Sequence, residues 1–263
     1  MEIKDFSSEK FDIFIQAGQS NSEGFGLGFV EDPYWVDERV WYLTQDMLFA
    51  PASENVMANE IQGNYSLSFA RKYIHDGYLA EGRKLLILRT SVGSTGFLSG
   101  HWNQTGECYL RMLSMCRFAL SLNLENRIKG LLWHQGENDV ADRASYEIHY
   151  GNLMELLNSV RREISVPNLP FIAGDFTHHW KNDNMERCIP IVNAIRTVCQ
   201  DDLFAAFVET DGLKSNKQEL GRKTQCGKEV IEDTIHFSRP SLYQLGERYF
   251  EAYKNILMSN SIK

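Results

Sequence analysis

The feature that most constrains the fold is a repeated alternation of short apolar runs with longer amphipathic stretches. The apolar runs carry β-branched and aromatic residues and have the length of buried strands. The amphipathic stretches place apolar residues three and four positions apart, as helices with one buried face do. Repeated strand–helix units predict a parallel sheet covered by helices on both faces. The predicted strands are 11–16, 39–43, 84–89, 128–133, 170–173 and 204–208, and the predicted helices are 65–75, 107–122, 143–164, 185–199 and a last one from about 240 to 256.

The chain is expected to form one α/β domain over residues 1–263. Its 263 residues are enough for a sizeable single core. Neither a linker, an internal repeat nor a low-complexity tract interrupts the strand–helix pattern. Two segments lack it: 44–64 is predicted to be a long loop, and the charged segment 212–232 is predicted to be a solvated excursion.

Composition limits the partners and the location. The chain is 43% hydrophobic and 24% charged, as soluble globular proteins are. A net charge of -8 argues against nucleic acid or an anionic membrane as the main partner. Neither a secretory signal nor a membrane span is visible, so we expect a cytoplasmic location. The five cysteines are scattered and form no C-x-x-C, which predicts reduced thiols and no zinc site.

Three of the predicted strands end in polar loops that contain glycine. The loops are 17–24, 90–96 and 134–139. The carboxyl ends of parallel strands lie at one edge of a sheet, where ligands bind. Ser20 brings a hydroxyl and a main-chain N–H to this edge, Gly93 an accessible N–H, and Gln135 an amide that can donate to an oxyanion.

A serine nucleophile needs a base, and His236, just before the last predicted helix, is the candidate. Asp233 lies three residues earlier, so one turn can bring its carboxylate to the imidazole. There it would fix the tautomer and stabilise the imidazolium. The structural alternatives are a polar turn serine at position 20 and a capping carboxylate beside a surface histidine.

Together these blocks resemble the SGNH hydrolase superfamily. They are Gly18-Gln19-Ser20-Asn21, Gly93, Trp133-His134-Gln135-Gly136-Glu137-Asn138-Asp139 and Asp233-x-x-His236. More narrowly, the chain is similar from about residue 11 to 254 to the carbohydrate esterases that include sialic-acid O-acetylesterases and acetyl-xylan esterases. The resemblance implies a three-layer α/β/α sandwich of flavodoxin-like type with a central parallel sheet.

The resemblance also implies roles for the matched residues. Ser20 is implied as the nucleophile and as an oxyanion donor through its N–H. The Gly93 N–H and the Gln135 amide are implied as the other donors, with glutamine in the place that asparagine holds in the wider superfamily. His236 is implied as the base and Asp233 as its partner. Neither a metal nor an organic cofactor is implied.

Three further side chains are candidates for contacting substrate: Asn21, Trp102 and Glu137. Trp102 could stack on a sugar ring or act as a packing anchor, and Glu137 could instead hold its loop. Two segments are longer than the resemblance leads us to expect. One lies between residues 212 and 233, next to the triad, and the other, 45–64, could reshape the pocket or act as a lid.

The sequence therefore predicts a serine esterase that hydrolyses O-acetyl esters on carbohydrates. Its partner would be an acetyl ester of a small molecule or oligosaccharide, with the sugar and the oligomeric state left open. Two other functions fit the same residues. An acyltransferase would use the same triad, and a non-catalytic carbohydrate-binding protein would use the same scaffold.

Overall fold

The structure is a computed structural model that describes residues 6–29, 34, 36–57, 60–221, 224–225, 228–229 and 232–261. Four cysteines in these ranges are free and buried, as predicted for reduced thiols: Cys108, Cys116, Cys188 and Cys199. The fifth, Cys226, lies outside the described residues. In the part of the chain that the structure describes, no helix is both long and apolar enough to cross a membrane.

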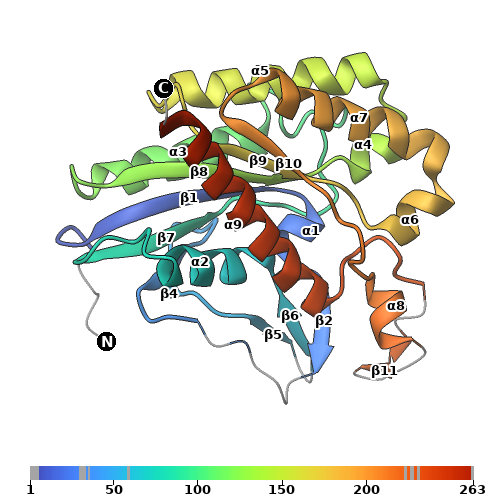
Figure 1. Cartoon of the computed structure of the whole chain (residues 1–263), viewed down its shortest axis with the longest axis horizontal. Helices are drawn as coiled ribbons and strands as arrows, with labels where there is room; N and C mark the ends of the chain where they lie inside the picture. Colours follow the sequence, from blue (N-terminus) through green and yellow to red (C-terminus); the bar gives the residue numbers. More distant parts are fainter. Residues whose placement is uncertain are drawn as a thin grey trace.

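A seven-stranded sheet forms the centre of the molecule (Figure 1). Its strands lie side by side in the order β10-β9-β8-β1-β7-β3-β4, and every neighbouring pair is parallel except β3 with β4. The predicted central parallel sheet is therefore confirmed. The strands are β1 Lys10–Gly18, β3 Val40–Leu43, β4 Phe49–Pro51, β7 Arg83–Arg89, β8 Arg127–His134, β9 Phe171–Gly174 and β10 Ala205–Val208.

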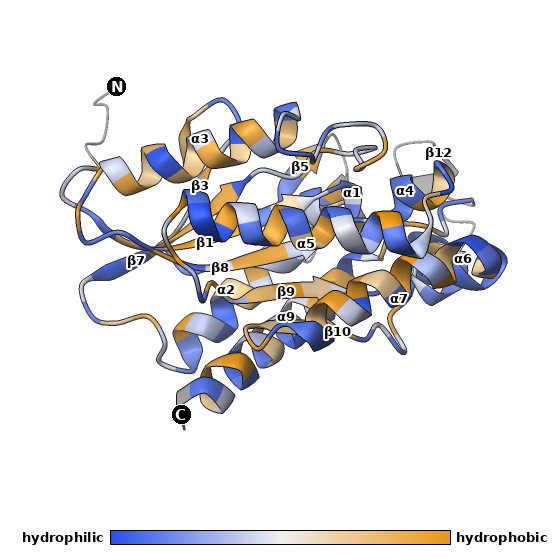
Figure 2. Cartoon of the chain, turned by 90° about the horizontal axis from the view of Figure 1, so that it is seen from above, coloured by the Kyte–Doolittle hydropathy of each residue, from blue (hydrophilic) through white to orange (hydrophobic). Residues whose placement is uncertain are grey.

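Helices cover both faces of the sheet, as Figures 1 and 2 show. Two of them, α2 and α9, pack against each other on one face, and α3, α5 and α7 cover the other. The α/β/α layering is thus also confirmed. The bounds are α2 Tyr65–His75, α3 Glu107–Ser121, α5 Tyr146–Glu163, α7 Met185–Asp201 and α9 Arg239–Ser261.

Strand β1 contributes to both cores. Phe11, Ile13 and Ile15 lie in the core under α3, α5 and α7. Phe14 points the other way, into the core under α2 and α9, where its ring lies 5.3 Å from that of Tyr253. A strand buried on both faces reads as an apolar run rather than as an alternation, which explains the sequence from residue 11 to 16.

Helix α5 begins later than predicted. The apolar pattern suggested a start near Arg143, but Arg143 has a φ of 59°, outside the helical region. The helix begins at Tyr146 because the side chain of Ser145 caps it and accepts from the N–H of Ile148 at 3.3 Å. Serine is a preferred N-cap residue, so the correction was available from the local sequence.

Both segments predicted to lack structure contain short elements. The 44–64 segment holds β4, β5 (Asn55–Met57) and β6 (Glu60–Gly63), and β6 pairs with β2 (Gly26–Phe29) in a second, three-stranded sheet. The 212–232 segment holds α8 (Asn216–Leu220) and the paired strands β11 (Thr224–Gln225) and β12 (Lys228–Glu229). These elements have two to five residues, too few for hydrophobic periodicity to mark them.

Three strand ends meet at one edge of the main sheet. In register, Gly18 of β1 lies opposite His134 of β8, and Gln16 lies opposite Arg89 of β7. The chain moves from β7 to β8 across β1, so the strand order reverses there. Ligands bind at such switch points in open α/β sheets, and the predicted convergence of the three loops is what the structure has.

Candidate active site

Ser20 is positioned by a sharp turn at the end of β1. Gly18 has a φ of 130°, and a Cβ on it would lie 2.0 Å from the main-chain oxygen of His134, so only glycine fits. This close approach lets the N–H of Gln19 donate to that oxygen at 3.0 Å. Ser20 then begins the one-turn helix α1 (Ser20–Glu23) with a side chain that is still reachable, since the residue is 7% exposed.

The structure brings Ser20, His236 and Asp233 together. His236 Nε2 lies 2.9 Å from the hydroxyl of Ser20. On the other side of the ring, Nδ1 lies 3.0 Å and 3.1 Å from the two carboxylate oxygens of Asp233. Hydroxyl, imidazole and carboxylate stand in the order that general-base activation of a serine requires.

Asp233 is held by donors that favour its ionised form. Its oxygens accept from the main-chain N–H of His236 at 3.1 Å and from Nδ2 of Asn216 at 2.8 Å. Burial acts to raise the pKa of Asp233, but these hydrogen bonds and the His236 ring outweigh it, so the pKa is lowered. An ionised Asp233 holds a proton on Nδ1 and leaves Nε2 free to accept one from Ser20.

The segment predicted to be a solvated excursion supports this half of the site. The first two N–H groups of α8, from Asn216 and Lys217, donate to the main-chain oxygens of His236 and Asp233, both at 2.9 Å. Phe25 stacks on the imidazole from another side, with ring centres 5.1 Å apart. The His236 ring is thereby held in position by hydrogen bonds and packing together.

Asn21 and Glu137, two candidates for contacting substrate, are buried and join loops to each other in this structure. Asn21 Nδ2 donates to Glu137 Oε1 at 2.8 Å and to the main-chain oxygen of Ile235 at 3.0 Å, while its Oδ1 accepts from the N–H of Phe237 at 3.0 Å. Asn21 and Glu137 are 0% and 1% exposed. They tie the loop of Ser20 to the loop of His236.

Trp102, which was predicted either to stack on a sugar or to act as a packing anchor, is buried. It is 0% exposed, its indole N–H donates to Thr95 Oγ1 at 2.9 Å, and its ring meets Trp133 edge-on at 5.0 Å. A side chain with no exposed face has none to offer a sugar, so the packing alternative is the one that the structure bears out.

Gly93 lies beside Ser20, but its N–H already has an acceptor. It donates to Oε2 of Glu23 at 2.8 Å. A Cβ placed on Gly93 would be 3.9 Å from the Cβ of Ser20, so the main chain here is close enough to serve an oxyanion formed at Ser20. The carboxylate of Glu23 stands at the donor that such an oxyanion would use.

Gln135 lies beneath the site rather than open to it. It is 0% exposed. Its Nε2 donates to Asp139 Oδ2 at 2.6 Å and to the main-chain oxygen of Thr95 at 3.3 Å. Asp139 also accepts from the N–H groups of Phe97 and Leu98, each at 3.0 Å. In this arrangement, the amide joins the second and third loops through Asp139.

A buried histidine lies directly under these loops. Burial lowers the pKa of His134 to about 3, and its Nδ1 lies 3.0 Å from the hydroxyl of Tyr249. Burial also raises the pKa of Glu137, whose Oε1 is 3.9 Å from His134 Nε2. Burial therefore favours the neutral form of both groups, as expected for side chains that support the loops away from water.

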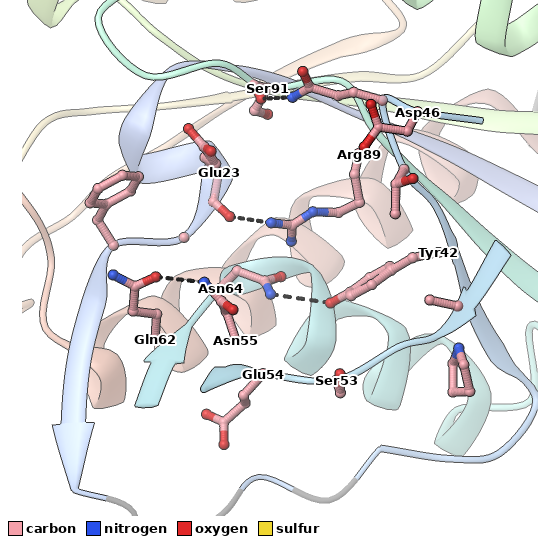
Figure 3. A pocket seen from close by; sticks show the side chains of 16 residues that line it. Glu23, Tyr42, Asp46, Ser53, Glu54, Asn55, Gln62, Asn64, Arg89 and Ser91 are labelled. Atoms are coloured by element: carbon pink, nitrogen blue, oxygen red, sulfur yellow. Dashed lines mark hydrogen bonds between the residues drawn. The ribbon is translucent and has the colours of Figure 1, made fainter. Parts of the chain in front are cut away.

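A cavity of about 660 Å³ lies close to Ser20, His236 and Asp233, although none of these three side chains lines it, and Figure 3 shows the residues that do. Two lining residues connect it to Ser20 and His236, because Glu23 shares helix α1 with Ser20 and Phe25 stacks on His236. Most of the residues that line it are of polar types. The lining includes Glu23, Phe25, Tyr42, Gln45, Asp46, Glu54, Asn55, Gln62, Asn64 and Arg89.

Arg89 is the cation in this lining. Its Nη2 donates to the main-chain oxygen of Glu23, its Nη1 reaches Gln16 Oε1 at 3.3 Å, and its guanidinium lies 4.9 Å from the ring centre of Tyr42. Within the described ranges, no carboxylate lies at ion-pair distance from it. Among those same residues, no group of three or more His, Cys, Asp or Glu side chains could hold a metal ion.

Sequence reasoning missed several of these neighbours. Asn216 and Phe25 reach the triad from distant segments and carry no motif. Glu23 was within reach, because it follows Ser20 by three residues and therefore shares a helical face with it. Asp139 was visible as the end of the third block, but its contacts depend on how two loops fold together.

Comparisons with known proteins show the family to which the chain belongs. The family model described as "Carbohydrate esterase, sialic acid-specific acetylesterase" matches residues 10–255. The "Probable carbohydrate esterase At4g34215" of Arabidopsis thaliana is 27% identical over 179 residues, which are 61% of this chain and 66% of that protein. The "Probable 9-O-acetyl-N-acetylneuraminic acid deacetylase" of Escherichia coli K12 is 25% identical over 144 residues, 45% of this chain and 43% of that protein. Each match spans less than two thirds of the relative.

Solved structures share the fold along their whole length. NanS superposes with a TM-score of 0.79 at 18% identity, covering 96% of this chain and 99% of the other. The Arabidopsis thaliana protein AT4G34215 superposes with a TM-score of 0.69 at 20% identity, covering 93% and 98%. Since the family model covers nearly the whole chain, the chain belongs to the carbohydrate esterase family of sialic acid-specific acetylesterases.

Proposed function

We propose that this protein is a serine esterase that removes O-acetyl groups from carbohydrates. The observation that carries the proposal is the continuous contact from the Ser20 hydroxyl through the His236 imidazole to the Asp233 carboxylate, at 2.9 Å and 3.0 Å. Membership in a family of carbohydrate acetylesterases supports the substrate class.

In the first half of the reaction, Ser20 Oγ attacks the acetyl carbonyl carbon while its proton passes to His236 Nε2. The electron pair of the C=O bond moves to oxygen and forms a tetrahedral oxyanion. When this intermediate collapses, the bond to the sugar oxygen breaks and His236 gives the proton to the departing alcohol. The product is an acetyl ester on Ser20.

In the second half, His236 accepts a proton from water, and the water oxygen attacks the acetyl-enzyme. Collapse of the second tetrahedral intermediate releases acetate and returns the proton to Ser20. Asp233 keeps its charge throughout and stabilises the imidazolium in both halves. The cycle consumes one water and one ester and needs no further co-reactant.

The oxyanion would be stabilised by main-chain donors. No described residue accepts from the N–H of Ser20, and the N–H of Gly93 lies beside it. Such donors are worth about 10²–10³-fold each in turnover. The Gln135 amide is the third proposed donor, and it would have to leave Asp139 Oδ2 when substrate binds.

We place the sugar in the cavity beside the triad. The amide and carboxylate side chains that line the cavity offer both hydrogen-bond donors and acceptors, which sugar hydroxyls require. Its volume of about 660 Å³ lies within the range of ordinary small-molecule sites. The extended lining from 44 to 64 would then select which acetylated sugar binds.

The test is acetate release from a panel of acetyl-xylo-oligosaccharides, O-acetyl sialic acids and acetylated monosaccharides. Ser20→Ala and His236→Ala should each lower turnover by at least about 10⁴-fold, with unchanged circular dichroism. Matched controls are Ser121→Ala and His75→Ala, which change the same residue types at exposed positions. Near-native turnover in Ser20→Ala would overturn the proposal.

A separate experiment distinguishes hydrolysis from transfer. If the enzyme is a hydrolase, acetate accumulates at the same rate with and without a sugar acceptor. Conversion of the acceptor to its acetyl ester, with a matching loss of acetate, would reassign the protein as an acyltransferase.

A further inference from the structure

Glu23 contacts one of the main-chain donors proposed for the oxyanion. It ends the one-turn helix that Ser20 begins, so both side chains leave the same helical face. Its Oε2 accepts the N–H of Gly93 at 2.8 Å and would lie only 3.4 Å from a Cβ on that glycine. One of the proposed oxyanion donors is therefore occupied by an internal carboxylate.

This carboxylate has no cationic partner among the described residues. The N–H of Gly93 is the donor from which its Oε2 accepts a hydrogen bond. An oxyanion and a carboxylate cannot share that donor, because like charges at such a separation repel strongly. Either the Gly93 N–H takes no part in the reaction, or Glu23 leaves it when substrate binds.

A destination for the Glu23 carboxylate lies on the same wall of the cavity. Arg89 already donates to the main-chain oxygen of Glu23, as the dashed line in Figure 3 shows. The guanidinium therefore already contacts the residue whose carboxylate it would receive. Arg89 has five N–H groups, and the hydrogen bonds given above use two of its nitrogens. Pairing with it would form a charge-assisted hydrogen bond.

We infer that Glu23 is a gate on the oxyanion site: its carboxylate occupies the Gly93 N–H in the free enzyme and moves to Arg89 when the acyl oxygen enters. The inference rests on the proposed function, because it requires Ser20 to be the nucleophile. It adds a residue whose removal makes the nucleophile more reactive, an effect that loss of a structural contact does not produce.

The test is the rate at which a fluorophosphonate labels Ser20, since its phosphoryl oxygen must enter the oxyanion site. Glu23→Ala should label at least about ten-fold faster than the native protein, because no charge-assisted hydrogen bond has to be broken first. Glu23→Gln should fall between the two, since its amide oxygen can still accept from Gly93 without the charge. Glu81→Ala, which removes an exposed carboxylate at the opposite end of β7, should label at the native rate.

Arg89 provides the second half of the test. Arg89→Gln should slow labelling about ten-fold in the native background, because Glu23 loses its charged alternative partner. In the Glu23→Ala background, the same change should alter the rate by less than about two-fold, since the two residues act through one step. Equal effects of Arg89→Gln in both backgrounds would overturn the coupling.

Labelling of Glu23→Ala and Glu23→Gln at or below the native rate, with native thermal stability, would overturn the gate and leave the proposed esterase intact. Absence of labelling in every variant, including the native protein, would overturn both. The two failures are thus distinguishable in one experiment.

Discussion

Replacing Asp233 by asparagine should disable the triad, and the contacts of this residue determine by how much. Its Oδ1 accepts from the main-chain N–H and the imidazole of His236, and its Oδ2 accepts from Asn216. Both oxygens thus face donors, so the NH₂ of an asparagine meets a donor in either orientation. Asn216 cannot easily turn its amide round, because Nδ2 also donates to the main-chain oxygen of Phe25 and Oδ1 accepts from the N–H of Leu27.

The conflict is most easily relieved at the imidazole. If His236 moves its proton from Nδ1 to Nε2, Nδ1 can accept from the new amide, but Nε2 then donates to Ser20 and cannot take its proton. A histidine held in the wrong tautomer costs about 10⁴-fold in kcat, or about 5 kcal/mol of transition-state stabilisation. We expect a loss of this size for Asp233→Asn in the hydrolysis of p-nitrophenyl acetate, with KM nearly unchanged.

A second substitution, at Asn216, tests whether the donors around Asp233 cause this loss. Asn216→Ala removes the donor that opposes one orientation of the new amide. The double variant Asp233→Asn with Asn216→Ala should therefore have a kcat about ten-fold higher than Asp233→Asn alone. Asn216→Ala by itself should cost less than about ten-fold, since it removes one hydrogen bond from an intact carboxylate. A loss below ten-fold in a folded Asp233→Asn protein would refute the proposed role of the carboxylate.

Three other predictions concern the support of the site. His134 is neutral in the folded protein down to about pH 3, whereas an unfolded histidine protonates near pH 6.5, so the unfolded state binds more protons between these values. The free energy of unfolding in urea should therefore fall by about 1 kcal/mol from pH 7 to pH 5.5 through this group. The variant His134→Gln should lack this pH dependence. Asp139→Asn should lower the free energy of unfolding by about 3 kcal/mol, because a buried acceptor of three donors is replaced by one that conflicts with them; an unchanged urea midpoint would contradict this. Trp102→Ala should cost about 3–5 kcal/mol of stability through the cavity it leaves, whereas a sugar-stacking role predicts a raised KM and unchanged stability.

The architecture was largely predictable from the sequence because strands buried on both faces leave long apolar runs. The run from residue 11 to 16 and its counterparts marked the parallel strands of the sheet, and α2 was predicted with its bounds. The short elements within 44–64 and 212–232 were not predictable in this way. Their pairing depends on partners far away in the chain, such as β2 with β6, and not on a local period.

The location of the site was also predictable from the sequence, whereas its side-chain contacts were not. Glycine-bearing loops after parallel strands indicated where Ser20, Gly93 and Gln135 would gather, since topology alone brings such loops to one edge. Which donors are free is a matter of side-chain contacts, and no pattern in the sequence shows that Glu23 reaches Gly93 or that Asp139 holds Gln135. The sequence likewise did not show that Asn21 and Trp102 are buried, since their residue types suit a sugar site and a core equally well.

The most direct test of the central claim is the identification of the residue that carries the acetyl group during turnover. The protein is mixed rapidly with an acetyl ester, quenched in acid and mapped by peptide mass spectrometry. The account predicts an added acetyl group on Ser20, its accumulation in His236→Ala if deacylation slows more than acylation, and no such adduct in Ser20→Ala. Turnover of the ester by the native protein with the acetyl group on another residue, or with an undiminished rate in Ser20→Ala, would contradict it.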